Sequence, residues 1–196
     1  MTEEIRLVWF PVAFLAGSFP TAYLVGKHVF HSDIRTQGSG NVGATNAFRV
    51  FGKGAGAAVF AADFLKGFLP VIAYARFVSA DPADTLWIGL AAVLGHVFTP
   101  FLRFKGGKGI ATGSGALAAA LPLLFALTLP VWVVVFAFTR IVSISSLAAL
   151  AGLFFYTFLF HLPPRASMAM LVILSLAVWT HRSNIARLRS GTEKKL

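Results

Sequence analysis

Three polar segments hold most of the side chains in this sequence that can do chemistry. The first, Gly38 to Arg49, combines glycines with Ser, Thr and Asn side chains and ends in an arginine. Glycine allows the backbone to approach a ligand closely, and hydroxyl, amide and guanidinium groups donate hydrogen bonds to phosphate. The segment contains G-x-G-x-x-G, but the dinucleotide fold that uses this pattern needs a preceding β-strand, and an apolar helix is expected here instead. We interpret the segment as a phosphate cradle, with a polar turn between helices as the alternative.

The second segment, Phe104 to Thr112, lies directly before an apolar stretch that is expected to be a helix. The start of a helix offers free N–H groups and a positive dipole end, so it favours anions. Two lysines and three glycines strengthen this interpretation. The segment is not a Walker-type loop, because Lys108 is followed by Gly109 rather than by Ser or Thr. A positively charged anchor at a membrane surface is the alternative, but an anchor needs no glycines.

The third segment, His181 to Glu193, follows the last apolar stretch. His181 and Asn184 are three residues apart and therefore share a face if the helix continues, and Arg187 extends that face. The alternative is a polybasic tail on anionic lipid, which needs neither histidine nor asparagine. That tail would consist of Arg182, Arg189, Lys194 and Lys195.

Other polar residues interrupt or border the apolar stretches. Asp63 and Lys66 are three apart inside one of them, where they form either a functional site or a structural ion pair. Ser143, Ser145 and Ser146 follow Arg140 and can bind phosphate or cap a helix. His28 and Asp33 have the H-x4-D spacing of one class of acyltransferases, which is a minor alternative. His96 and His161 are isolated, and His96 lies in an apolar stretch.

The composition excludes several classes of protein. Only 12% of the residues are charged and 57% are apolar, whereas a soluble domain has about 25% charged residues. A soluble enzyme and a disordered chain are therefore both disfavoured. The 17 basic and 7 acidic residues give a net charge of +10, which favours anionic partners. There is no cysteine, and no cluster has metal-ligand spacing, so no metal or cofactor is expected.

The elements that must position these segments are membrane helices. A span of ~30 Å needs about 20 apolar residues. The apolar stretches are Leu7–Gly26, Ala55–Ala75, Leu86–Leu102, Ile110–Thr139, Ile141–Leu162 and Ala166–Thr180. The acidic start of the chain predicts that the first of these is a retained helix and not a signal peptide. The fourth is too long for one ordinary span, so we predict two helices that turn near Leu121-Pro122.

The distribution of basic residues predicts the topology. Lys and Arg concentrate on cytoplasmic loops. The segments 27–53, 103–108 and 182–195 hold 4, 3 and 5 of them, and they share one side only if the chain crosses an even number of times between Lys108 and Arg182. We therefore predict an all-α integral membrane protein with seven transmembrane helices, the N-terminus outside and the C-terminus cytoplasmic. Residues 1–196 are expected to form a single domain.

Taken together and in order, the polar segments resemble those of the bacterial integral-membrane glycerol-3-phosphate acyltransferases that use acyl phosphate as donor. The resemblance covers nearly the whole chain. It is carried by Gly17–Tyr23, Asp33-Ile34-Arg35, Gly38–Arg49, Asp63–Gly67, Gly95-His96, Lys105–Thr112 and His181–Glu193.

This resemblance implies a reaction. A fatty acyl group moves from acyl phosphate to the 1-hydroxyl of glycerol 3-phosphate and gives 1-acyl-glycerol 3-phosphate (lysophosphatidic acid) and inorganic phosphate. The step is the first acylation of phospholipid synthesis, and it uses neither acyl-CoA nor acyl carrier protein directly. The implied partners are the two substrates and the lipid bilayer of the bacterial cytoplasmic (inner) membrane. No nucleic acid and no obligate protein partner are expected.

The resemblance also implies roles for individual residues. Ser39, Arg49 and Lys108 are expected to bind phosphate and neutralise charge, and His181 and Asn184 to orient the attacking hydroxyl or a phosphate. Either His181 or the donor phosphate accepts the proton. Further substrate contacts are expected at Gly38, Gly40, Asn41, Thr45, Asn46, Lys105, Gly106, Gly107, Gly109, Thr112, Ser143 and Ser146. Structural ion pairing is expected at Asp63, Lys66 and Glu193.

Two other classes of function compete with this one. A transporter or channel for organic anions also fits the spans and the basic face, although the polar segments cluster on one face and no inverted repeat is visible. A phosphotransferase that uses a nucleotide-activated lipid would need an acidic metal site, which the sequence lacks.

Overall fold

The computed structural model describes residues 3–196, and within that range every regular element is a helix. The helices are α1 (Glu3–Ser18), α2 (Thr21–Val29), α3 (Ala44–Phe51), α4 (Lys53–Phe77), α5 (Pro82–Val97), α6 (Ile110–Ala120), α7 (Pro122–Thr139), α8 (Val142–Leu159), α9 (Pro164–Thr180) and α10 (Arg182–Arg189), with short 3-10 helices at Ile34–Thr36 and Pro100–Leu102. The expected all-α class is therefore confirmed for the described residues.

Five segments are long and apolar enough to cross a membrane, namely Glu4–Val29, Lys53–Phe77, Pro82–Leu102, Pro122–Thr139 and Val142–Leu159. The pair α9 and α10, bent by 53°, makes a sixth if it is counted as one span. The expectation of seven spans counts α6 in addition. With 11 residues, α6 is ~16 Å long and too short to cross a bilayer core alone.

Two prolines break long apolar stretches into separate helices. The stretch 110–139 divides at Leu121, and Pro122 begins α7, a position where the missing N–H of proline costs nothing. The predicted turn near Leu121-Pro122 is confirmed. The first stretch, which the sequence presents as continuous, is also divided, because α1 ends at Ser18 and α2 begins after Pro20.

Small residues bring the backbones of α1, α4, α5 and α6 together. A Cβ on Gly17 of α1 would collide with the carbonyl oxygen of Ala92 on α5, and a Cβ on Gly67 of α4 with that of Thr112 on α6. Membrane helices that lack a side chain at such points gain close van der Waals contact between backbones. These glycine contacts therefore unite the four helices tightly.

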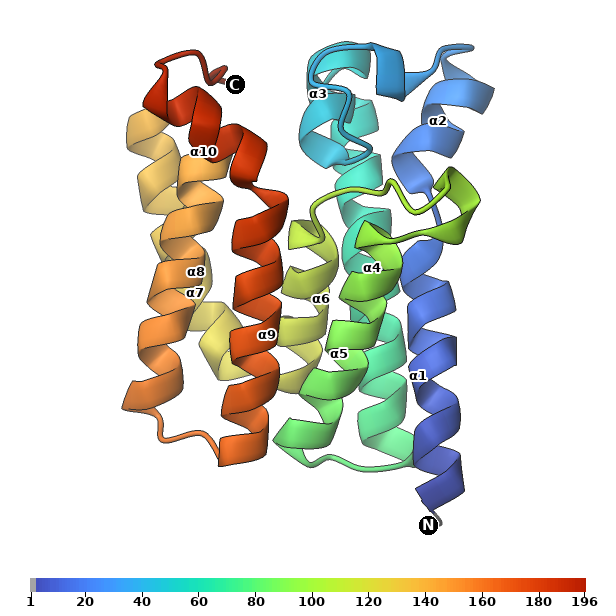
Figure 1. Cartoon of the computed structure of the whole chain (residues 1–196), viewed down its shortest axis with the longest axis vertical. Coiled ribbons are helices and arrows are strands. Elements are labelled where there is room, and N and C mark those ends of the chain that lie inside the picture. Colours follow the sequence, from blue (N-terminus) through green and yellow to red (C-terminus); the bar gives the residue numbers. More distant parts are fainter. Residues whose placement is uncertain (1–2) are drawn as a thin grey trace.

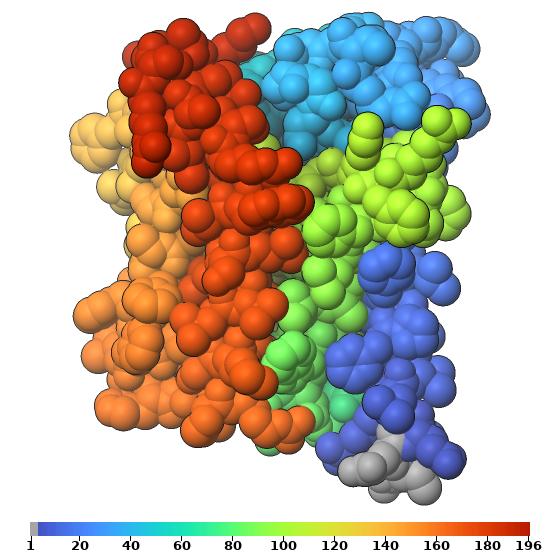
Figure 2. Space-filling view, viewed as in Figure 1, coloured from blue at the N-terminus to red at the C-terminus, as the bar shows by residue number. Residues whose placement is uncertain are grey.

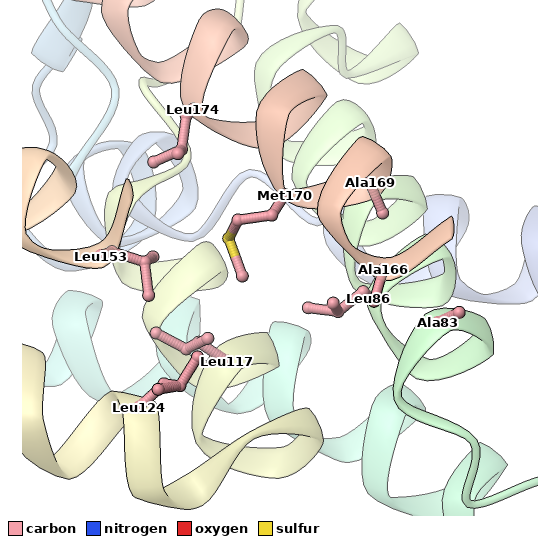
Figure 3. Packing of buried hydrophobic residues seen from close by; sticks show 9 residues of the cluster. All are labelled: Ala83, Leu86, Leu117, Leu124, Leu153, Ala166, Ala169, Met170 and Leu174. Carbon is pink, nitrogen blue, oxygen red and sulfur yellow. The ribbon is translucent and has the colours of Figure 1, made fainter. Parts of the chain in front are cut away.

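One cluster of buried apolar side chains lies between α5 and the helices that follow it, and a second packs α1, α4, α5 and α6 together. Figure 3 shows Leu86, Leu117, Leu124, Leu153 and Met170 packed around a common interior. At the end of the bundle where α1 begins, the Asp84 carboxylate accepts hydrogen bonds from Arg6 at 3.0 Å and from Arg165 at 3.3 Å. That carboxylate ties α1, α5 and α9 together.

The three polar segments gather at the other end of the bundle. Figure 1 shows α3, α10 and the chain between α5 and α6 at one end, while α1 begins at the opposite end. In the space-filling view of Figure 2, the C-terminal segment adjoins the segment around α3. The helical bundle thus brings segments about 150 residues apart in sequence to one surface.

Candidate active site

A buried asparagine organises the first polar segment. The Asn46 side-chain amide donates to the carbonyl oxygens of Gln37 at 3.0 Å and Ile34 at 3.3 Å, and its oxygen accepts from the Ser39 backbone N–H at 2.8 Å. Gly38 has φ +61°, and a Cβ there would collide with the Asn46 side chain. Asn46 is expected from the sequence to contact substrate, but in the structure its amide holds the loop that exposes Ser39.

The remaining predicted residues of this segment lie around that loop. Gly40 also has a left-handed backbone, with φ +70°. The Asn41 N–H donates to Ser39 Oγ at 3.5 Å, and Thr45 is half-buried in the first turn of α3. The Ser39 side chain is exposed.

The second segment folds back onto the C-terminal end of α5. The Gly106 N–H donates to the carbonyl oxygen of Val97 at 2.9 Å and the Gly107 N–H to that of His96 at 3.2 Å. A Cβ on either glycine would collide with His96. These glycines therefore permit a close approach of the loop to α5, and the chain then enters α6 through Gly109.

Lys108 points from this loop to the third polar segment. Its Nζ donates to Asn184 Oδ1, and its backbone oxygen accepts a hydrogen bond from Thr180 Oγ1 at 3.2 Å. Burial lowers the pKa of Lys108 to about 8, and the nearby charges of Arg187 and Arg49 act in the same direction, whereas Glu193 opposes them. Lys108 is therefore a cation at neutral pH, but it loses its proton more readily than an exposed lysine.

A buried carboxylate connects the elements around Lys108. Glu193 accepts hydrogen bonds from Asn184 Nδ2 at 2.6 Å, Ser143 Oγ at 2.8 Å and Arg187 Nε at 2.6 Å. Burial alone would raise the pKa of Glu193, but these three hydrogen bonds outweigh it and hold the pKa below its ordinary value. The charged carboxylate thus joins α8, α10 and the C-terminal tail. We call Lys108, Asn184, Glu193, Arg187 and Ser143 the Glu193 network.

Arg49 reaches the same region from α3. Its Nη2 donates to the Lys194 carbonyl oxygen at 2.8 Å, while its Nε is buried without a hydrogen-bond partner among the described residues. Burial lowers the pKa of Arg49, as does nearby Arg187, and Glu193 opposes both. A buried donor without a partner is costly, and a bound anion would satisfy it.

His181 lies where α9 bends into α10. The side chain is buried, and its Nδ1 is 2.7 Å from the Ala177 carbonyl oxygen. Because a carbonyl oxygen only accepts, we assign the hydrogen to Nδ1, which leaves a lone pair on Nε2 in the neutral ring. That nitrogen is able to accept a proton.

Several predicted residues have other partners. Thr112 bonds to His96 at 3.2 Å, and Ser146 accepts from the Trp132 ring N–H at 3.2 Å inside the α7–α8 interface. The Lys66 Nζ is 2.9 Å from Asp63 Oδ1 and 2.8 Å from the Phe19 carbonyl oxygen, so this pair stabilises the break between α1 and α2.

The remaining expectations concern Lys105 and metal binding. Lys105 is exposed at the loop surface. Among residues 3–196 no group of three His, Asp or Glu side chains is placed to hold a metal ion. Sequence reasoning missed Thr180, which holds the Lys108 backbone. It also gave no partner to His96, which in sequence stands alone among apolar residues.

An apolar groove of about 590 Å³ leads away from the Glu193 network between α8 and α9. Leu147, Leu150 and Phe154 line it from α8, and Leu174, Val178 and Trp179 from α9. Leu147 is one helical turn from Ser143, and Trp179 is two residues before His181. The groove between α8 and α9 therefore comes within one helical turn of the Glu193 network.

Comparisons with known proteins agree on one family. Residues 7–191 match the family described as glycerol-3-phosphate acyltransferase. A relative of that name from Geotalea daltonii is 44% identical over 193 residues, which are 98% of this chain and 97% of the relative. The structure is also similar to crystal structures of PlsY, an integral membrane glycerol 3-phosphate acyltransferase. Its glycerol 3-phosphate form has a TM-score of 0.93 at 38% identity, covering 98% of this chain and 96% of that one. Its lysophosphatidic acid form has a TM-score of 0.88 at 38% identity, covering 98% and 95%.

Proposed function

The chain belongs to the glycerol-3-phosphate acyltransferase family, and from this premise we propose that its acyl donor is acyl phosphate. Membership of the family makes the protein a multi-pass membrane acyltransferase of phospholipid synthesis. The acyl group moves to the 1-hydroxyl of glycerol 3-phosphate, and lysophosphatidic acid and inorganic phosphate are released. The observation that carries the proposal is the cationic cluster of Arg49, Lys108 and Arg187 near Glu193, whose partner Ser143 lies on α8, one helical turn before the apolar groove.

The cationic cluster suits substrates that carry phosphate. Three basic side chains surround Glu193, and Arg49 Nε has no partner in the described chain. Glycerol 3-phosphate and acyl phosphate each bring an anion that can accept hydrogen bonds from these groups. Ser39 is exposed, and its loop is bonded to Asn46, which lies one helical turn before Arg49 on α3; in our proposal Ser39 donates to a phosphate from this loop.

The apolar groove suits the acyl chain. Apart from Ser175, its lining from α8 and α9 is hydrocarbon and aromatic. In our proposal the head of a chain in this groove lies toward Ser143 and His181. Each buried methylene contributes about 0.8 kcal/mol to binding. The groove thus favours a long-chain donor whose carbonyl carbon stops at the polar network.

We propose direct attack without an acyl-enzyme. The glycerol hydroxyl oxygen bonds to the acyl carbon, and the bond from that carbon to the phosphate oxygen breaks. The leaving phosphate carries away the electron pair, and the hydroxyl proton goes to His181 Nε2 or to the departing phosphate. Acyl phosphate is a mixed anhydride that is already activated, so orientation by Asn184 and Lys108, worth up to ~7–11 kcal/mol in favourable cases, supplies much of the catalysis.

We also propose an orientation in the membrane. The end of the bundle with α3 and α10 carries the basic segments, and such segments face the cytoplasm. The chain would cross seven times as one domain of residues 1–196, with the loop 105–109 and α6 counted together as one crossing and with the N-terminus outside. In this proposal the protein lies in the bacterial inner membrane and draws both substrates from the cytoplasmic side.

The test is phosphate release by purified protein given palmitoyl phosphate and glycerol 3-phosphate, without CoA or carrier protein. We expect release that depends on glycerol 3-phosphate and is lost in Lys108→Ala but kept in Lys53→Ala, an exposed lysine at the same end of the bundle. Acylation with palmitoyl-CoA but not with palmitoyl phosphate would refute acyl phosphate as the donor. No acylation with either donor, from protein shown to be folded, would refute the proposed acyltransferase activity. Gradient-dependent uptake of organic anions into liposomes would then point to a transporter.

Whether His181 takes the proton is tested separately. If it does, His181→Gln lowers kcat by about 10²-fold or more. Near-normal turnover by His181→Gln would assign the proton to the donor phosphate. A stable acyl adduct on Ser39 would overturn direct attack.

A further inference from the structure

His96 is a buried histidine that the reaction just described does not use. It lies in the last turn of α5, with 6% of its surface exposed. Its Nδ1 is 3.2 Å from Thr112 Oγ1, a hydrogen bond that joins α5 to α6. Its backbone oxygen accepts the Gly107 N–H at 3.2 Å. The residue therefore contacts the chain on both sides of Lys108, at Gly107 and at Thr112.

The imidazole fills the space directly beneath Gly107. A Cβ on Gly107 would collide with Nε2 of His96 and lie 3.0 Å from its Cε1. Beside the ring is a small cavity of about 10 Å³, lined also by Thr21, Lys66 and Gly107, with room for about one water molecule. Because this cavity already adjoins the loop, loss of the ring would leave Gly107 without support on that side.

We propose that His96 is a positioning residue for the acceptor site. Its imidazole is bonded to Thr112 and supports Gly107, and it thereby fixes the position of the Lys108 ammonium group that binds glycerol 3-phosphate. The inference rests on the proposed function, since it takes Lys108 as the group that binds the acceptor. His96 itself touches neither substrate. Its effect reaches the site through the single peptide bond that joins Gly107 to Lys108.

The first test separates acceptor binding from the rest of the reaction. His96→Ala removes the ring, and a displacement of the loop on the order of 1 Å can cost about 10²-fold in rate. We expect a loss of about tenfold or more in kcat/KM for glycerol 3-phosphate, mostly through KM, with little change in KM for palmitoyl phosphate. Should His96→Ala fail to fold, His96→Asn keeps a group that can bond to Thr112 while it shortens the side chain beneath Gly107.

The second test uses the two neighbouring glycines as a matched pair. An alanine at 107 meets the His96 ring and the Val42 backbone oxygen at 2.9 Å, whereas an alanine at 106 meets the His96 and Val97 backbones. Removal of the ring can therefore relieve only the first. We expect His96→Ala combined with Gly107→Ala to be about threefold or more better than the product of the two single effects. Combined with Gly106→Ala, it should give no such gain.

Amide hydrogen exchange in the segment 98–112 gives a readout that does not depend on activity. His96→Ala should speed exchange at Gly106 and Gly107, whose N–H groups are bonded to the end of α5. If wild-type protein shows no acyl transfer, the proposed function fails, while this measurement still tests the support of the loop. Unchanged exchange in folded His96→Ala, or equal rescue of both glycine variants, would overturn the inference.

Discussion

The acyl transfer proposed here should have an alkaline limit set by Lys108. Its pKa is about 8 because the ammonium group is largely removed from water. Below pH 7 at least about nine in ten free enzyme molecules carry the charge, and at pH 9 about one in ten do. The acceptor's own charge changes little above pH 7, since the second pKa of a phosphate ester is near 6. The pH dependence above 7 therefore reports the lysine.

The expected magnitude follows from that pKa. If only the ammonium form binds glycerol 3-phosphate, kcat/KM for this substrate falls to about half of its plateau value at pH 8 and to about a tenth at pH 9, with a slope that approaches about tenfold per pH unit beyond that. The assay is phosphate release at limiting acceptor and saturating palmitoyl phosphate between pH 6.5 and 9.5. A blank without enzyme at each pH corrects for spontaneous hydrolysis of the donor.

Lys108→Arg is the informative variant. A guanidinium keeps its proton across this whole range, so the alkaline limb should disappear even if the overall rate is lower. A wild-type profile that stays flat to pH 9.5 would refute the assignment. So would a limb at the same pH in Lys108→Arg, because the titrating group would then lie elsewhere.

Three further predictions concern the frame around the site. Glu193→Gln removes a charged acceptor of three hydrogen bonds and should cost about 1.5–3 kcal/mol in stability, seen as a lower melting temperature in detergent; an unchanged melting temperature would contradict the network described for it. Gly67→Ala should impair folding because its Cβ overlaps the α6 backbone, whereas Gly54→Ala, which meets nothing within 4 Å, should not; equal yields of folded protein would refute this packing argument. Leu150→Trp fills the α8–α9 groove and should raise KM for palmitoyl phosphate more than KM for a short-chain acyl phosphate. An equal effect on both would refute the proposal that the acyl chain lies in that groove.

Hydropathy predicted where the helices lie better than where they end. The long apolar run could be divided at Leu121-Pro122 because its length exceeds one span and because the basic segments need an even number of crossings. The break at Phe19-Pro20 was not predicted, since no charge or excess length marks it. In the structure Lys66, 47 residues away from Phe19, donates to the carbonyl oxygen freed there. A long-range partner of this kind is invisible in local sequence.

In the candidate site, too, local features could be predicted from the sequence, whereas contacts between distant residues could not. Residue types alone predicted that the three polar segments lie at one membrane face, because glycine, lysine and histidine next to an apolar stretch indicate a binding loop at a helix end without reference to the rest of the fold. Which side chains would meet depended on tertiary packing: Ser143 reaches Glu193 across 50 residues, whereas Ser146, one turn further, is bonded to Trp132. Asn46 shows a second difficulty, since an amide that holds a loop and an amide that holds a ligand look the same in sequence.

The packing of the bundle implies that its two sides differ in mobility. The α1, α4, α5 and α6 helices meet backbone to backbone, and 72% of the apolar window of α5 is buried. Only 11% of the window of α7 is buried, and that helix packs chiefly on α8. The α7–α8 hairpin is therefore held by fewer buried contacts than α5, and the hydrogen bond from Ser143 to Glu193 joins it to the C-terminal tail. A lipid with one acyl chain could thus leave sideways into its own leaflet, without its chain ever entering water.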